Sequence, residues 1–234
     1  MLKNRDRFAA LALSHCILTM KANTLPLTAI VLAGGQSSRM GRDKASIVIQ
    51  DVPLIWQVCQ VAQACAAQVY VVTPWPEKYQ EMLQGESQAA SPIAMIREVP
   101  FPGETKPHGP LVGFAQGLAL VETEWVLLLA CDLPRLSAEV VQEWVEQLIE
   151  MPNNTVSIAL LPHSPKGWEP LCGFYRRQCL PLLTAYINQG GRSFQHWLAQ
   201  HPVAELAVSN REVLFNCNTP ADLQQVKPDA LDAH

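Results

Sequence analysis

Residues 29–44 read Ala29-Ile-Val-Leu-Ala-Gly-Gly-Gln-Ser-Ser-Arg-Met-Gly-Arg-Asp-Lys44, and this stretch decides the fold. Its first five residues form a continuous apolar run with a β-branched pair, which predicts a strand buried on both faces. The run stops at Gly34-Gly35, where the missing Cβ atoms allow positive φ angles and close approach of backbone N–H groups to an anion. Arg39 and Lys44 add fixed positive charge, which suits a chain of phosphates. We therefore expect a triphosphate-binding turn at the end of this strand.

The two best-known phosphate-binding motifs do not match this stretch. The P-loop ends in Gly-Lys-Ser/Thr, whereas Lys44 lies three residues after Gly41 and precedes Ala45. The dinucleotide fingerprint Gly-x-Gly-x-x-Gly is also absent from it. A glycine-rich turn after a strand occurs in many α/β proteins without a ligand, so Gly34-Gly35 alone favours that alternative. The whole string of small and basic residues is what favours phosphate binding.

From residue 53 onward, the pattern of apolar residues alternates between helical and extended segments. Helical spacing of apolar residues predicts helices at 54–67, 77–83, 110–119 and 138–150. Short apolar runs predict further strands at 69–73, 93–96, 126–130, 156–161 and 168–175. Such alternation implies right-handed crossovers and a mostly parallel sheet that binds ligands at the carboxyl ends of its strands.

The composition restricts the class of protein. Of the 234 residues, 49% are hydrophobic and 16% charged, which predicts one substantial α/β domain and little disorder. The formal net charge of −4 argues against nucleic-acid binding, which usually needs a basic face. The seven cysteines include no Cys-x-x-Cys pair, so neither a zinc site nor a disulfide framework is indicated. We expect reduced, buried thiols in a cytoplasmic protein.

The first residues imitate a signal peptide only in part. Lys3, Arg5 and Arg7 precede an apolar run, but His15 interrupts the apolar segment and no small-residue cleavage site follows. The stretch is too short to cross a bilayer, so we expect neither export nor membrane insertion. Met20 is an alternative start. Residues 1–19 are then an extension that is helical, disordered or not translated, ahead of a single domain at 20–234.

The most apolar strand, 126–130, ends in Cys131-Asp132-Leu133-Pro134. A carboxylate at the end of a buried strand is costly to keep charged unless a cation or a group of donors lies close. Mg²⁺ commonly takes one or two carboxylates and completes its octahedron with phosphate oxygens and water. Asp132 fits that role, and the alternative is that it caps the following turn.

The second half of the chain offers two further polar segments. Arg192 precedes Ser193, a possible helix N-cap, so Arg192 would bind a phosphate there or, as the commoner alternative, remain solvated. Near the end, Thr219 as an N-cap explains a helix start without any function. That account leaves Asn216 and Asn218 unexplained.

Four ordered segments together resemble the signature of nucleotidyltransferases, most closely that of the molybdenum cofactor guanylyltransferase family. The segments are Leu32 to Lys44, Gly-Pro-Leu-x-Gly at 109–113, Cys-Asp-x-Pro at 131–134 and Asn-x-Asn-Thr-Pro at 216–220. Residues 168–175 also resemble the segment that precedes the cofactor-binding half of that family. The resemblance covers about residues 28–226. It implies a single-domain, Rossmann-like, three-layer α/β/α fold with a GTP-binding half at about 28–135 and an acceptor-binding half at about 136–226.

The resemblance also implies an activity, the transfer of GMP from GTP to molybdopterin. The products would be the guanine dinucleotide form of the molybdenum cofactor and pyrophosphate. The terminal phosphate of the acceptor attacks the α-phosphorus in line, so the enzyme supplies positioning and charge neutralisation, with Mg²⁺ as cofactor and no side-chain nucleophile. Transient contact with proteins of cofactor synthesis or molybdoenzyme maturation is also expected.

The same resemblance assigns roles to individual residues. Arg39, Lys44 and Asp132 would be catalytic, and Asp132 would also hold the metal. The residues expected to bind GTP are Leu32, Ala33, Gly34, Gly35, Lys44, Thr73, Glu98, Gly109 and Asp132. Those expected to bind the acceptor are Arg192, Ser193, Asn216 and Asn218. Thr73 stands where some relatives carry Asn, and Glu98 where Asp is usual, and both lie near the expected base and ribose.

Three other functions stay open at this point. One is a cytidylyltransferase that uses CTP on the same cofactor, and a second is a sugar-phosphate nucleotidyltransferase. The double glycine Gly34-Gly35 favours guanine, because the CTP-using relatives often have Ala-Gly there. The third is a catalytically silent nucleotide-binding protein, which would not need Asp132 and Lys44 together.

Overall fold

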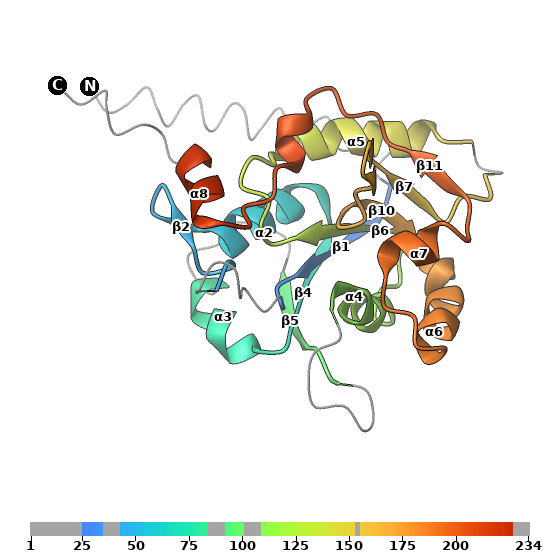
Figure 1. Cartoon of the computed structure of the whole chain (residues 1–234), viewed down its shortest axis with the longest axis horizontal. Helices are drawn as coiled ribbons and strands as arrows, with labels where there is room; N and C mark the ends of the chain where they lie inside the picture. The colour runs from blue at the N-terminus through green and yellow to red at the C-terminus, as the bar shows by residue number, and fades with distance from the viewer. Residues whose placement is uncertain (1–24, 35–42, 84–91, 101–108, 153–154, 227–234) are drawn as a thin grey trace.

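The computed structural model describes residues 25–34, 43–83, 92–100, 109–152 and 155–226. A seven-stranded sheet, ordered β11-β7-β10-β6-β1-β4-β5, runs through this part of the chain (Figure 1). Its strands are β1 (Leu27–Leu32), β4 (Gln68–Thr73), β5 (Ile93–Arg97), β6 (Trp125–Ala130), β7 (Ala159–Leu161), β10 (Cys172–Arg176) and β11 (Val203–Glu205). All of them run parallel except β10, which is antiparallel to β6 and β7. The expected mostly parallel sheet is confirmed.

Helices cover both faces of this sheet. One face packs against α2 (Leu54–Cys65), α3 (Pro76–Leu83) and α5 (Ala138–Glu150). The other face packs against α4 (Pro110–Leu118), α6 (Leu180–Asn188) and α7 (Phe194–Leu198), and Figure 1 shows α5 and α4 on opposite sides of β6. A short helix, α8 (Pro220–Val226), packs against the hairpin β2 (Val48–Ile49) and β3 (Val52–Pro53). The three-layer α/β/α architecture expected from the sequence is therefore confirmed.

The central strand β1 is buried on both faces, as its apolar run predicts. Ala29 and Val31 join the core under α2 and α5, whereas Ile30 joins the core under α4. All three side chains are 0% exposed. Parallel pairing of β1 with β4 on one side and β6 on the other brings the ends of all three strands to one edge.

Two expected strands differ from the structure in extent. The expected strand at 156–161 is limited to β7 (Ala159–Leu161), because pairing with β10 begins only at Ala159. The expected strand at 168–175 is broken into β9 (Gly167–Trp168) and β10 (Cys172–Arg176). Pro170 lies in the break and has no N–H to donate to a sheet ladder. The chain there leaves one hairpin and enters the main sheet.

Two short hairpins were not expected from the sequence. In the β2–β3 hairpin, Gln50 and Asp51 have φ angles of 51° and 63°, as the two central residues of a tight hairpin turn require. The second hairpin pairs β8 (His163–Ser164) with β9. Neither turn contains the Asn-Gly or Asp-Gly pair that marks such hairpins in a sequence. The predicted extension at 1–19 lies outside the described residues.

Gly117 provides a test of how closely α4 packs on the sheet. A Cβ at this position would lie 2.9 Å from Val72 Cγ2 and 3.1 Å from Ile30 Cδ1. We expect Gly117→Ala to lower the free energy of unfolding by about 1–3 kcal/mol, measured by urea denaturation, because the core is overpacked. The exposed α5 substitution Glu143→Ala should change it by less than about 0.5 kcal/mol. Equal stability of the two variants would contradict this packing.

Candidate functional site

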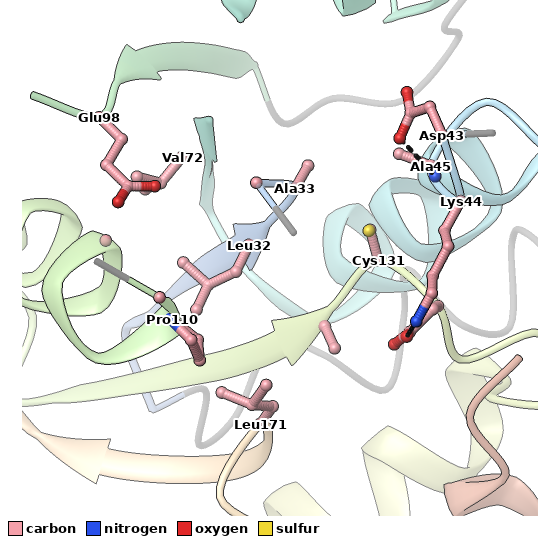
Figure 2. A pocket seen from close by; sticks show the side chains of 15 residues that line it. Leu32, Ala33, Asp43, Lys44, Ala45, Val72, Glu98, Pro110, Cys131 and Leu171 are labelled. Carbon is pink, nitrogen blue, oxygen red and sulfur yellow. Dashed lines mark hydrogen bonds and ion pairs between the residues drawn. The ribbon is translucent and has the colours of Figure 1, made fainter. Parts of the chain in front are cut away.

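A cavity of about 180 Å³ opens at the carboxyl ends of β1, β4 and β6. Figure 2 shows Glu98 on one side of it and Lys44 on the other, with Leu32 and Ala33 between them. Its lining comes from strand ends, from α4 and from the turn after residue 42, and consists of Leu32, Ala33, Gly34, Asp43, Lys44, Ala45, Val72, Glu98, Gly109, Pro110, Gly113, Ala130, Cys131, Asp132 and Leu171. The site therefore lies at the edge where a mostly parallel sheet binds ligands.

Most residues predicted to bind GTP line this cavity: Leu32, Ala33, Gly34, Lys44, Glu98, Gly109 and Asp132. Thr73 does not line it, because its side chain is buried behind the strand end, where Oγ1 accepts a hydrogen bond from the Trp75 N–H at 3.2 Å. The Thr73 carbonyl accepts from the Glu98 N–H at 2.8 Å and so helps to place Glu98. Gly35 and Arg39 lie outside the described residues.

Three predicted residues meet at the end of β6. Lys44 Nζ lies 3.5 Å from Asp132 Oδ2 and also donates a hydrogen bond to Asn218 Oδ1. The Cys217 N–H donates to the Asp132 carbonyl at 3.0 Å, which fixes the C-terminal segment to the strand end. In the sequence, Lys44 is 88 residues from Asp132 and 174 residues from Asn218. The predicted combination of Lys44 with Asp132 is therefore present.

The electrostatics at Asp132 favour a bound cation. Burial raises the pKa of the Asp132 carboxyl above its ordinary value, and the charge of Lys44 offsets only part of that effect. No group of three or more His, Cys, Asp or Glu side chains that could hold a metal occurs within the described residues. A single carboxylate such as Asp132, together with phosphate oxygens and water, can complete the octahedron of Mg²⁺. That ligand set is usual for Mg²⁺, so the residues present fit a magnesium ion.

Glycines shape the opposite end of the cavity around Glu98. A Cβ at Gly34 would lie 2.9 Å from Pro74 Cδ and 3.1 Å from Glu98 Oε2, and a Cβ at Gly113 would lie 3.3 Å from the same oxygen. Gly34 does not have a positive φ angle, so the structure uses this glycine for close approach. Because neither glycine carries a side chain, the Glu98 carboxylate has room in the cavity wall.

The other predicted acceptor residues lie elsewhere. Arg192 donates from Nη1 to the carbonyls of Ile187 and Gly191, at 2.8 Å each, after the end of α6. Ser193 Oγ caps α7 by accepting from the His196 N–H at 3.3 Å. Neither residue lines this cavity, and an acceptor role for either stays a prediction. Asn216 lines a smaller neighbouring cavity.

Sequence reasoning missed Asp43 as a site residue, although it directly precedes Lys44. Its carboxylate accepts hydrogen bonds from the Ala45 N–H at 3.2 Å and the Ser46 hydroxyl at 2.7 Å. From α3, the Tyr79 hydroxyl donates to it at 2.8 Å, and Lys78 Nζ lies 2.9 Å away. Burial alone would raise the pKa of Asp43, but these donors outweigh it and leave the pKa below its ordinary value.

These contacts attach the turn that carries Lys44 to α3. Tyr79 is 1% exposed, and burial together with the negative charge of Asp43 raises its pKa well above the ordinary value. The hydroxyl therefore keeps its proton and remains a donor. Because Asp43 is held on the side of α3, the next residue along the chain directs its amine to Asp132. The only indication in the sequence that Asp43 belongs to the site is its position in the motif Leu32 to Lys44.

Comparison with known proteins places the chain in a family. The sequence model of the MobA-like NTP transferase domain matches residues 29–226. A "Probable molybdenum cofactor guanylyltransferase" from Trichormus variabilis is 57% identical over 86% of this chain and 90% of its own length. A "Molybdenum cofactor guanylyltransferase" from Pseudomonas putida is 31% identical over 85% of this chain and 96% of its own.

Solved structures give the same fold. The crystal structure of "Molybdopterin-guanine dinucleotide biosynthesis protein A" from Archaeoglobus fulgidus has a TM-score of 0.64 at 23% identity, covering 86% of this chain and 96% of that one. An Aquifex aeolicus protein described as putative has a TM-score of 0.65 at 22% identity, covering 85% and 96%. A cavity at the carboxyl ends of a mostly parallel sheet lies where nucleotide-binding α/β proteins hold their ligands. More particularly, this chain belongs to the MobA-like NTP transferase domain family. Within the described residues, none of the helices has the length and apolar character to cross a bilayer.

We expect Tyr79→Phe to weaken the attachment of the Lys44 turn to α3. Loss of one hydrogen bond, about 1 kcal/mol, should lower kcat/KM for a nucleoside triphosphate about fivefold. Steady-state kinetics of pyrophosphate release measure the change. Tyr186→Phe is a matched control, because its hydroxyl donates to the Ser193 carbonyl at 3.3 Å, a contact outside the cavity lining. The interpretation would be wrong if both variants lost nucleotide efficiency equally.

Proposed function

We propose that the protein transfers GMP from GTP to molybdopterin and releases pyrophosphate. The observation that carries this proposal is that the two ends of one cavity differ in their chemistry. One end holds the Lys44 and Asp132 side chains, which suit phosphates and a metal ion, and Asn218 contacts Lys44 there. The other end holds the carboxylate of Glu98, which suits a base with N–H donors. The names of the relatives support the same activity.

The Glu98 end supports guanine as the base. Guanine presents two adjacent donors, the N1–H and the exocyclic amine, and a carboxylate accepts both at once. Cytosine and adenine each present a single amine donor on the corresponding edge. Gly34 and Gly113 carry no side chain that would occupy the space beside Glu98 Oε2. The triphosphate then extends from Glu98 toward Lys44, past the backbone of Ala33 and Gly34.

The chemical step needs no nucleophile from the protein. A phosphate oxygen of the acceptor forms a bond to the α-phosphorus as the bond to the bridging oxygen breaks, and pyrophosphate leaves with the electron pair. Lys44 places its ammonium beside Asp132, where it neutralises charge on the phosphates. Asp132 would hold Mg²⁺, which, when bound, neutralises further charge on the phosphate oxygens. Asn218 accepts from Lys44 and so orients its amine.

A cytoplasmic location is part of the proposal. Cys59, Cys172, Cys179 and Cys217 are buried thiols and form no disulfides in the described part of the chain. Burial raises the pKa of Cys59 to about 12, so this thiol stays protonated and unreactive at neutral pH. Thiols of this kind are typical of proteins in reducing compartments. Contact with other proteins of cofactor synthesis stays a prediction.

The first test is pyrophosphate release with Mg²⁺ and molybdopterin, comparing GTP with CTP, ATP and UTP. We expect release with GTP. Asp132→Ala should lower turnover at least a hundredfold, on the order of one lost transition-state charge contact. Calorimetric titration should still detect GTP binding by that variant, and Asp132→Asn, which keeps the shape, should lose turnover as well. Release only with CTP would make the protein a cytidylyltransferase, and release with none would favour a silent binder.

Base selection gives a separate test at Glu98. Inosine triphosphate lacks the exocyclic amine of GTP, so the wild type should prefer GTP by about tenfold or more, the range for one hydrogen bond to a charged group. Glu98→Gln should bring that preference toward one, because an amide oxygen accepts without a charge. The ratio of kcat/KM for the two nucleotides measures it. An unchanged ratio would remove Glu98 from base recognition.

A further inference from the structure

Asp222 lies in the first turn of α8, and its carboxylate binds the backbone just before that helix. Its Oδ2 accepts hydrogen bonds from the Asn218 N–H at 2.8 Å and from the Thr219 N–H at 2.7 Å. In return, the Asp222 N–H donates to Thr219 Oγ1 at 3.2 Å, which completes a reciprocal cap of the helix. Asp222 does not line the cavity that holds Lys44 and Asp132. The backbone of Asn218 is therefore attached to α8 by a side chain outside the cavity.

The Asn218 side chain connects this support to the Lys44 amine. Asn218 Oδ1 accepts a hydrogen bond from Lys44 Nζ, and the same amine lies 3.5 Å from Asp132 Oδ2. At the other end of the Asn218 amide, Nδ2 reaches the Asn216 carbonyl at 3.5 Å, which is long for a hydrogen bond. The position of the Asn218 amide therefore depends mainly on where the backbone of residue 218 lies.

The helix that carries Asp222 and the turn that carries Lys44 are built on the same small core. Leu223, the residue after Asp222, is 5% exposed and packs there with Ile47, Ile49, Leu54 and Cys217. The Ile47 N–H donates to the Lys44 carbonyl at 3.1 Å. Figure 1 shows α8 next to the hairpin that contains β2. The Asp222 carboxylate is thus presented from a place that is fixed relative to the Lys44 turn.

Two routes lead from Asp222 to Lys44, one through hydrogen bonds and one through charge. The hydrogen bond from the Asn218 N–H is the main cause that holds the pKa of Asp222 below its ordinary value, and the charge of Lys44 contributes least. The carboxylate is therefore ionised at neutral pH, and a charged acceptor holds N–H groups more firmly than a neutral one. The contacts on the Asp222 carboxylate favour the route through Asn218.

We propose that Asp222 is a positioning residue for the reaction, which holds Asn218 so that the Lys44 amine points into the cavity. Without the Asp222 carboxylate, the backbone of residue 218 loses its attachment to α8. The Lys44 amine then loses a fixed partner and is free to turn away from the triphosphate. This inference rests on the proposed function, since it takes GTP as the substrate that Lys44 contacts. The helix cap before α8 thereby acquires a second role, the orientation of a charge in the site.

The first experiment is a double-mutant cycle between Asp222 and Asn218, measured as kcat/KM for GTP in pyrophosphate release. Asp222→Ala should lower kcat/KM about fivefold, the range for one hydrogen bond. Asn218→Ala should lower it at least as much, because Lys44 loses its acceptor. In the Asn218→Ala background, Asp222→Ala should change kcat/KM less than about twofold, because the side chain that transmits its effect is gone. Losses that multiply would overturn the proposal.

Thr219→Ala is the matched control for the helix cap. It removes the bond from the Asp222 N–H but leaves both backbone bonds to the carboxylate. This variant should lower the midpoint of urea unfolding about as much as Asp222→Ala does, yet change kcat/KM less than about twofold. An equal loss of kcat/KM in Thr219→Ala and Asp222→Ala would assign the effect to helix stability and overturn the proposal.

Asp222→Asn separates the two routes to Lys44. An amide oxygen at the same position still accepts from the Asn218 and Thr219 N–H groups, so this variant should keep more than about half of the wild-type kcat/KM. A loss as large as in Asp222→Ala would show that the charge acts on Lys44 directly, which would contradict positioning through Asn218.

GTP binding in the absence of the acceptor repeats the cycle without turnover. Calorimetric titration of the wild type, Asp222→Ala, Asn218→Ala and the double variant should give Kd values with the same non-additive pattern as kcat/KM. Additive losses of affinity would overturn the role of Asp222. Wild-type protein that binds GTP but releases no pyrophosphate with molybdopterin would instead contradict the proposed function, so the two failures are distinguishable.

Discussion

The contact between Lys44 and Asp132 is the constraint on which the rest of the site depends. A carboxylate at the end of β6, a strand whose six residues are all buried, needs a cation close by. Lys44 supplies one from the turn after β1, and Asn218 fixes the Lys44 amine from the C-terminal segment. Three distant parts of the chain are thereby held at one edge of the sheet. The charge pair stays partly exposed, with side chains 21% and 15% accessible, so a substrate phosphate can reach it.

The contacts around Asp43 and Glu98 complete this arrangement from the other side. Asp43 attaches the Lys44 turn to α3, whereas Thr73 and the packing around Gly34 place Glu98. Both supports come from the region of β4 and α3, on the side of the sheet away from β10. The Lys44 end and the Glu98 end of the cavity are therefore supported by the same part of the fold.

Local signals in the sequence predicted the mostly parallel sheet and the placement of Lys44 and Asp132 at its edge, whereas the three-layer architecture and a role for Asn218 came from the family resemblance. Apolar runs mark the strands, and small or charged residues at their ends mark the ligand-binding edge. The hydrogen bond and the ion pair that hold Asp43 had no local signal in the sequence, since the partners Tyr79 and Lys78 lie on a separate helix. The break at Pro170 was visible as a proline within an expected strand, yet the aromatic and apolar residues around it favoured a continuous strand. Gly34 was predicted as a site residue for positive φ and for close approach of the backbone, and in the structure it lines the cavity without a positive φ, so only the argument from space applies.

In the described part of the seven-stranded sheet, β10 is the one strand that runs antiparallel to its neighbours. Because β10 runs against its neighbours, its beginning, and not its end, lies beside the ends of the parallel strands. The chain thus enters the ligand-binding edge through the 169–171 segment without interrupting any strand that carries donor residues. Insertions or substitutions in this entry segment would change the wall of the smaller cavity and leave β1, β4 and β6 uninterrupted. In a fold built this way, the segment that leads into β10 can vary in length and composition while the parallel strands beside it keep their pairing.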